Sequence, residues 1–280
     1  MGEILEGVIS RLEKTSDTPE LDSQVLIASL LNKPRSWVLA HTEEIIGRET
    51  VLSLEGLVIR LEGGEPLPYV LGTWEFFGLD FEVTPDVLIP RPETELLVER
   101  AIALLRGLAD ENREVNVLEV GTGSGCIAIS LAHNVPNCRI TASDISPAAL
   151  GVALRNAKKY RLAERIAFVQ SDLIPKSPKH LYSMIVANLP YIPTATLRNL
   201  KVTRHEPSLA LDGGKDGLRL IRRLLNQVPA AIAPGGTVIL EIEASKGAEA
   251  ESAARKAFPK GVIHLYQDLA GLDRILEVQL

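Results

Sequence analysis

The sequence is poor in residues that bind metals or form cross-links. Only two cysteines and five histidines occur in 280 residues. The cysteines, Cys126 and Cys138, form no Cys-x-x-Cys pair, and no two histidines have the spacing of metal ligands. We therefore expect neither a disulfide framework nor a metal site, and we interpret both cysteines as buried thiols.

Long apolar runs and an excess of basic residues are absent as well. No stretch approaches the roughly 18 apolar residues that a membrane-spanning helix needs. The first residues, MGEILEGVISRLEK, carry acids where a signal peptide carries bases, so we expect a cytoplasmic protein without a membrane partner. The formal net charge is −6. Because binding of free nucleic acid needs a basic surface, a nucleic acid substrate is disfavoured.

The remaining composition fits a globular protein of one large domain or two smaller ones. Acidic residues are concentrated at the start: residues 1–74 contain 12 acidic and 6 basic residues, whereas the rest of the chain is balanced. This excess fits a protein partner with a basic surface, although a solvated surface gives the same pattern.

Residues 1–65 are predicted to form a small helical domain. Apolar residues recur at helical spacing near its start, and Thr18-Pro19 is typical of an N-cap followed by a first-turn proline. A further helix is predicted over residues 51–61, which a glycine pair follows.

Residues 66–92 are predicted to form a β-hairpin connector, because WEFFGLDFEV alternates like two strands around Gly78 and prolines follow it. Residues 93–280 alternate helical patterns with short β-branched runs, which is typical of an α/β fold with helices on both faces of a parallel sheet. Seven strands are expected, at residues 115–120, 139–144, 166–172, 183–188, 237–242, 262–266 and 274–280. The last two are too close for a helical crossover, so we expect them to be antiparallel.

A glycine-rich segment follows the first of these strands, at the edge where open α/β sheets bind ligands. Its glycines let the backbone approach a ligand closely. A dinucleotide fingerprint, G-x-G-x-x-G, needs glycine where Cys126 stands, so a cofactor without a pyrophosphate fits better than a nicotinamide dinucleotide. A plain tight turn is the alternative for this segment taken alone. The candidate cofactor-binding residues here are Glu119, Gly121, Thr122, Gly123, Ser124 and Gly125.

The next two strands end in acidic residues that suit a nucleoside. Asp144, which precedes Ile145, can accept hydrogen bonds from both hydroxyls of a ribose. An aspartate at a strand end is more often a helix N-cap, but Ser146 offers a better cap here. Asp172 can accept from an adenine amino group and Leu173 can pack on the ring, unless this segment is a solvated turn.

The fourth strand runs into Asn188-Leu189-Pro190-Tyr191, the most informative motif of the chain. An amide or aromatic amine nitrogen is a poor nucleophile, so its alkylation depends on positioning. The Asn188 side-chain oxygen and the Leu189 carbonyl can accept its two N–H bonds. Pro190 holds the Leu189 carbonyl rigidly, and Tyr191 can stack on the flat group. A strand-ending turn is the alternative.

With these residues in view, the sequence resembles the protein-(glutamine-N(5)) methyltransferases that modify peptide chain release factors. The resemblance covers nearly the whole chain, through GTWEFFGLDFEV, IPRPETELLVE, VLEVGTGSGCIAISLA, ASDIS, NLPYI and HEPSLALDGGKDGL. The PRPETE and EPSLALDGGKDG segments are more specific to this family than the glycine-rich segment, which all class I methyltransferases share.

The resemblance implies a Rossmann-like, seven-stranded class I methyltransferase sheet behind a helical domain that docks the substrate. S-adenosylmethionine would be the methyl donor, and class I peptide chain release factors the protein substrate of a monomeric enzyme. Asn188 and Leu189 would bind the glutamine of the GGQ tripeptide beside Tyr191, and Asn188 would also contact the cofactor together with the glycine-rich segment, Asp144, Asp172 and Leu173. For Arg91 and Glu206, an internal salt bridge and a substrate contact both stay open.

Two departures from the family pattern stand out. Leu189 replaces the first proline of the usual N-P-P-Y motif, and Glu243 stands where glycine is common. Since the reacting carbonyl is kept at residue 189, we expect the chemistry to be kept.

The rival functions are a DNA adenine-amino methyltransferase, which normally needs a basic recognition domain, a non-catalytic protein with the cofactor fold, and a nicotinamide-dependent dehydrogenase.

Overall fold

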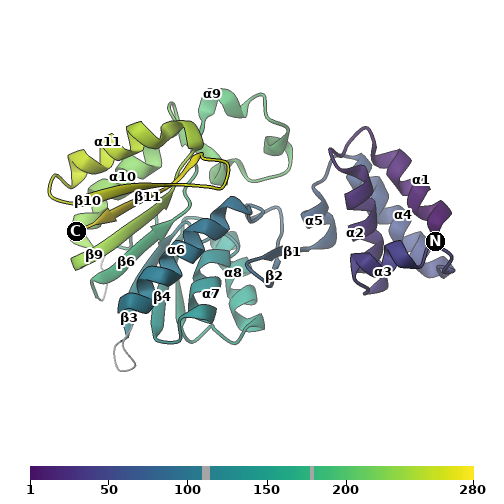
Figure 1. Cartoon of the computed structure of the whole chain (residues 1–280), viewed down its shortest axis with the longest axis horizontal. Helices are drawn as coiled ribbons and strands as arrows, with labels where there is room; N and C mark the ends of the chain where they lie inside the picture. Colours follow the sequence, from purple (N-terminus) through teal and green to yellow (C-terminus); the bar gives the residue numbers. More distant parts are fainter. Residues whose placement is uncertain (109–113, 177–179) are drawn as a thin grey trace. The chain divides into compact units, whose positions relative to one another are not determined.

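The computed structural model describes residues 1–108, 114–176 and 180–280. Contacts within the chain divide it into two compact units, Met1–Thr73 and Trp74–Leu280 (Figure 1). Within the described ranges, no helix combines the length and the apolarity that crossing a membrane requires.

The first unit is helical, as the apolar spacing predicts. It contains α1 (Gly2–Leu12), α2 (Pro19–Leu31), α3 (Arg35–Ala40), α4 (Arg48–Glu62) and α5 (Leu67–Leu71). Leu12, Leu26 and Val58 are fully buried between these helices. Thr18 stands at the N-cap position of α2, but the predicted cap hydrogen bond is absent because its hydroxyl donates to the Asp22 side chain.

The predicted hairpin consists of β1 (Thr73–Phe76) and β2 (Leu79–Glu82), with Gly78 at φ +73° in the turn. Phe76 and Phe81 are buried in the core of the second unit. The Asn156 side chain accepts from the Glu82 N–H at 2.7 Å and donates to the Glu82 carbonyl at 3.0 Å. The hairpin is therefore an integral part of the second unit.

The second unit is built on one mixed sheet that contains all seven predicted strands. The strands are β3 (Val115–Val120), β4 (Cys138–Asp144), β5 (Ile166–Gln170), β6 (Tyr182–Ala187), β9 (Ile232–Glu241), β10 (Val262–Gln267) and β11 (Asp273–Gln279). Their order is β10-β11-β9-β6-β3-β4-β5, and β10 and β11 are antiparallel as predicted. β9 begins five residues before the predicted start, because its Pro-Gly-Gly stretch forms an irregularity within the strand instead of a turn.

The order of the strands places a ligand site between β3 and β6. The chain proceeds from β3 outward to β4 and β5 and then returns to β6 on the other side of β3. Open α/β sheets bind ligands at such a reversal, outside the carboxyl ends of the strands. The glycine-rich segment after β3 and the Asn188 motif after β6 both lie at this point.

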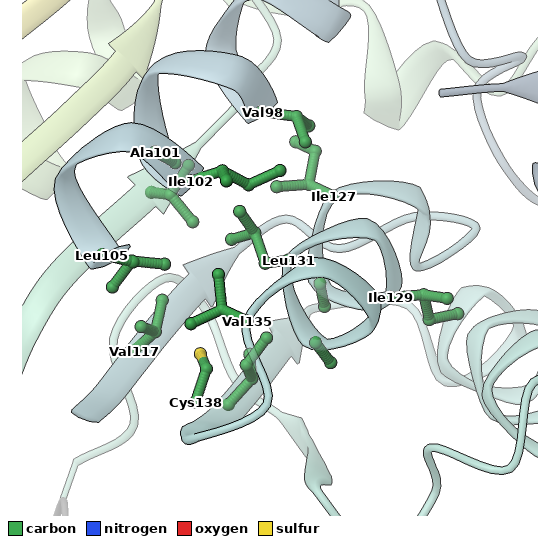
Figure 2. Close-up of a cluster of buried hydrophobic side chains, with 14 of the residues drawn as sticks. Val98, Ala101, Ile102, Leu105, Val117, Ile127, Ile129, Leu131, Val135 and Cys138 are labelled. Carbon is green, nitrogen blue, oxygen red and sulfur yellow. The ribbon is translucent and has the colours of Figure 1, made fainter. Parts of the chain in front are cut away.

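Helices cover both faces of the sheet. One face is packed by α6 (Glu93–Leu108), α7 (Cys126–Asn134) and α8 (Pro147–Lys159), and the other by α10 (Arg219–Gln227) and α11 (Gly247–Ala257). Val117 packs on the first face and Leu118 on the second, the alternation expected of a strand buried on both sides. Figure 2 shows the first face, where Cys138 lies among apolar side chains. Cys138 is buried as predicted, whereas Cys126 is only partly buried.

Candidate functional site

A cavity of about 810 Å³ opens at the carboxyl ends of the strands, entirely within the second unit. Its size is that of a small-molecule site. Most of the residues predicted from the sequence line it: Gly121, Thr122, Gly123, Ser124, Asp144, Ile145, Asp172, Leu173, Asn188, Leu189 and Pro190. Glu119, Gly125 and Tyr191 do not line it, although each lies directly beside lining residues in the chain.

The glycine-rich segment bends sharply between β3 and α7. Gly121, Gly123 and Gly125 have φ values of +77°, +55° and +82°. A Cβ at Gly125 would lie 3.1 Å from both Ala153 and Ile129, so glycine lets α7 pack closely on its neighbours. A Cβ at Gly123 would meet no atom of the described residues within 4 Å, which leaves room there for a ligand.

Glu119 lies behind this segment and is fully buried. The Thr122 hydroxyl donates to its Oε2 at 2.5 Å. Burial raises the pKa of the Glu119 carboxyl to about 8, although the Thr122 hydrogen bond lowers it. Glu119 thus stabilises the glycine-rich segment through its hydrogen bond with Thr122. A direct contact between Glu119 and a cofactor stays a prediction.

Replacing Glu119 with glutamine is expected to change how stability depends on pH. Between pH 4.5, the ordinary pKa, and pH 8, the folded protein keeps a proton that the unfolded chain releases, so stability falls as pH rises. Glutamine does not titrate, so this decline, on the order of a few kcal/mol, should largely disappear. Thermal unfolding between pH 5 and 8.5 measures it, with Glu164→Gln at an exposed position as control. Equal slopes for Glu119→Gln and the wild type would contradict the assignment.

Asp144, at the end of β4, presents its carboxylate to the cavity. Its Oδ2 accepts from the Gly123 N–H and its Oδ1 from the Ser146 N–H, both at 2.9 Å. The Ser146 hydroxyl in turn accepts from the Ala149 N–H at 3.2 Å and caps α8, as the sequence predicts. Because each carboxylate oxygen has further acceptor capacity, Asp144 can still accept from two ribose hydroxyls.

Asp172 and Leu173 follow β5, which ends at Gln170, two residues earlier than predicted. The Asp172 carboxylate pairs with Arg223 at 2.8 Å, and both side chains are exposed. Leu173 is buried and adopts a left-handed backbone conformation with φ +67°. Residues with a Cβ rarely adopt this conformation, and those that do are concentrated at functional sites. No motif in the sequence pointed to Arg223.

Asn188 and Leu189 follow β6 at the centre of the cavity wall. The Asn188 Nδ2 donates to the Thr94 hydroxyl at 3.0 Å, which leaves the Asn188 Oδ1 available as an acceptor. The Leu189 side chain is buried against the glycine-rich segment, since a Cβ at Gly121 would lie 3.2 Å from Leu189 Cδ2. The leucine that departs from the family pattern therefore connects the two segments.

Tyr191 and its hydrogen-bond partner Glu241 are not among the residues that line the cavity. The hydroxyl donates to the buried Glu241 Oε1 at 3.2 Å, and burial raises the pKa of both groups. Stacking of Tyr191 on a substrate stays a prediction. Sequence reasoning missed Thr94 and Glu241, because each is a single polar residue inside a helix or strand pattern.

The HEPSLALDGGKDGL segment both lines the cavity and supports the Asn188 motif; its lining residues are Pro207, Ser208, Leu209, Ala210 and Asp212. β7 (Ile192–Pro193) pairs with β8 (Asp212–Gly214), which places this segment directly on the backbone of Tyr191. Glu206 is buried, pairs with Arg91 and accepts from the Ile89 N–H at 3.2 Å. The internal salt bridge left open by the sequence is therefore present, and Arg91 also lines the cavity.

Glu243 lies after β9 and does not line the cavity. Its carboxylate accepts from the Ser245 N–H at 3.0 Å and caps the short 3-10 helix Ala244–Lys246. The second departure from the family pattern thus has a local structural role.

The residues of the cavity fit S-adenosylmethionine. The space at Gly123, the remaining acceptor capacity of Asp144 and the apolar surface of Leu173 suit a backbone approach, a ribose and an adenine, respectively. The cofactor has no pyrophosphate, in agreement with the absence of a third dinucleotide-type glycine at Cys126.

The two units match different family models. Residues 3–72 match the model described as the PrmC N-terminal domain, and residues 98–204 match that of the methyltransferase small domain. Among solved structures, a methyltransferase from Pyrococcus furiosus has a TM-score of 0.52 at 18% identity and covers 73% of this chain and 90% of its own. The ribosomal protein L11 methylase of Lactobacillus delbrueckii subsp. bulgaricus has a TM-score of 0.50 at 19% identity, covering 70% and 82%. These structures confirm the predicted Rossmann-like methyltransferase fold.

Curated relatives extend the match over nearly the whole chain. The release factor glutamine methyltransferase of Moorella thermoacetica is 40% identical over 259 residues, which are 92% of this chain and 90% of the relative. The enzyme of the same name from Bordetella pertussis is 38% identical over 259 residues, 92% of this chain and 93% of the relative. That identity over that length confirms the predicted resemblance: the chain belongs to the release factor glutamine methyltransferase family.

Proposed function

We propose that this protein transfers a methyl group from S-adenosylmethionine to the side-chain amide nitrogen of the glutamine in the GGQ tripeptide of class I peptide chain release factors. One observation carries the proposal: the Asn188 motif after β6 and the glycine-rich segment after β3 line the same cavity at neighbouring strand ends. A methyl donor and a planar amide can be held side by side there.

The protein's contribution to the reaction is to position a weak nucleophile. The lone pair of an amide nitrogen is delocalised into its carbonyl, so rate depends on orientation. The Asn188 Oδ1 and the Leu189 carbonyl accept the two N–H bonds and fix the plane of the amide, and Pro190 limits the freedom of the Leu189 carbonyl. Bound S-adenosylmethionine supplies an electrophilic methyl group.

The remaining residues of the cavity bind the cofactor. Asp144 accepts from the ribose, Asp172 and Leu173 bind the adenine, and the segment from Gly121 to Gly125 forms the floor, with Ile145 and Asn188 also in contact. Glu119 holds this floor through Thr122.

Each segment of the chain has its own role in the proposed reaction. Residues 1–65 form the domain that docks the release factor, residues 66–92 connect it, and residues 93–280 carry out methyl transfer. The excess of acidic residues in residues 1–74 suits a basic partner surface. The enzyme acts as a monomer in the cytoplasm and takes no free nucleic acid.

A transfer assay with labelled S-adenosylmethionine tests the function. An intact class I release factor should be labelled, whereas the same factor with alanine in place of the GGQ glutamine should not. Duplex DNA serves as the second control because a planar adenine amine is the closest competing substrate. Labelled DNA with an unlabelled release factor would overturn the proposal.

A further inference from the structure

Helix α10 packs one of its faces against the segment that follows β5. Four residues of α10 recur at intervals of three and four and therefore share a face of the helix: Leu220, Arg223, Leu224 and Gln227. Leu224 is buried in the same apolar cluster as Leu173, and Leu220 packs against that cluster. The apolar residues of this face thus hold α10 next to Leu173.

The two polar residues of this face each hydrogen-bond to a neighbour of Leu173 in the chain. The Arg223 guanidinium donates to Asp172 Oδ2 at 2.8 Å. Gln227 Oε1 accepts from the Ile174 N–H at 3.3 Å. Because Asp172 and Ile174 lie on either side of Leu173, α10 holds this short segment at both of its ends.

Arg223 uses only one of the two oxygens of the Asp172 carboxylate. Both residues line the cavity, as do Leu173 and Leu220. Asp172 Oδ1 makes no hydrogen bond within the part of the chain that the structure describes. Since an ionised carboxylate accepts at both oxygens, the ion pair leaves Oδ1 to accept from a ligand. Both side chains are about half exposed, so the pair adds little to folding stability, and its main consequence is the direction of the carboxylate.

We infer that Arg223 is a positioning residue that holds the Asp172 carboxylate toward the amino group of the adenine and so strengthens the preference of the site for an adenine nucleoside. An exposed carboxylate without a partner rotates freely, and ordering it on binding lowers the affinity for a ligand. Arg223 orders the carboxylate before the cofactor binds. This role rests on the proposed function, in which Asp172 binds the adenine.

Two ligands separate this role from a direct contact of Arg223 with the nucleoside. They are S-adenosylhomocysteine and S-inosylhomocysteine, in which a carbonyl oxygen replaces the amino group of the adenine. The wild type should bind the adenosyl compound at least about 10-fold more tightly, because the carbonyl offers no donor to the Asp172 carboxylate at that position. Asp172→Asn should nearly abolish this preference, since an amide presents either a donor or an acceptor to the base.

Arg223→Ala should weaken binding of the adenosyl compound by about 3- to 10-fold and leave binding of the inosyl compound nearly unchanged. Arg223→Lys keeps a cation beside Asp172 and should stay near the wild type. The matched control is Arg222→Ala. Arg222 forms a similarly exposed ion pair with Asp216 at 2.6 Å, and neither is among the described residues that line the cavity, so this variant should bind both compounds as the wild type does.

Calorimetry with the two compounds measures these affinities without a release factor. When Asp172→Asn is already present, Arg223→Ala should cause no further loss of preference, because Arg223 acts through Asp172. The inference would be overturned if Arg223→Ala weakened both compounds equally or kept the wild-type preference, or if the wild type had no preference. A wild type that binds S-adenosylhomocysteine but does not label the release factor would overturn the proposed function instead, and the affinities would still decide the role of Arg223.

Discussion

The Asn188→Ala variant is expected to lose methyl transfer to the release factor by about 10³-fold, while its affinity for S-adenosylmethionine changes only modestly. The substitution removes the acceptor that orients the glutamine amide, and loss of one oriented polar contact in an active site costs about 10²–10³-fold in rate. Most of the cofactor surface, including Asp144 and the glycine-rich segment, is untouched. Single-turnover kinetics and calorimetry with S-adenosylmethionine measure the two quantities separately.

A matched control for this variant is Asn226→Ala. Asn226 is an exposed residue of α10 that does not line the cavity, so its replacement should leave both quantities near the wild type. If Asn188→Ala lost cofactor binding but kept the wild-type rate at saturation, Asn188 would be a cofactor residue and the role proposed for it would be wrong.

The Gly217→Ala variant is expected to lower methyl transfer by about 100-fold, because a displacement of about 1 Å at a reacting group has that effect. A Cβ at Gly217 would lie 2.3 Å from the Tyr191 carbonyl oxygen, and one at Gly213 would lie 2.7 Å from Tyr191 Cα. Backbone must therefore move, and the backbone nearest to it is that of the Asn188 motif. The left-handed φ of +81° adds strain of about 1–3 kcal/mol.

The control for Gly217→Ala is Gly271→Ala. Gly271 has a similar φ of +75°, but a Cβ there would meet no atom within 4 Å in the part of the chain that the structure describes. Both variants should lose stability from backbone strain, and only Gly217→Ala should lose methyl transfer beyond that. Equal activity of the two variants in transfer assays below their unfolding temperatures would show that the DGGKDG segment does not hold the active-site backbone.

Much of the fold follows from local patterns in the sequence. The central strand β3 has the predicted bounds because it is buried on both faces and reads as a continuous apolar run. β9 begins before its predicted start, because neighbouring β6 holds Pro234 and the glycines after it in the sheet through an irregular register. The Thr18 hydroxyl donates a hydrogen bond to the nearby Asp22 carboxylate and does not accept one from a backbone N–H of α2.

The site was predictable where its residues form motifs and not where they act singly. The glycines and the Asn188 motif come directly after strands, so their convergence on one cavity follows from the topology. Thr94, Arg223 and Glu241 carry no local signal, because their roles depend on partners that are distant in the chain. The hydrogen bond between the Tyr191 hydroxyl and the buried Glu241 was not predictable for the same reason.

The most direct test of the account is a crystal structure of the enzyme with S-adenosylhomocysteine and a release factor whose GGQ loop is intact. The glutamine side-chain nitrogen should lie within hydrogen-bond distance of both the Asn188 Oδ1 and the Leu189 carbonyl oxygen, facing the sulfur of the cofactor product. A glutamine bound elsewhere, or Asn188 turned away from the cofactor with no space between them for an amide, would contradict it.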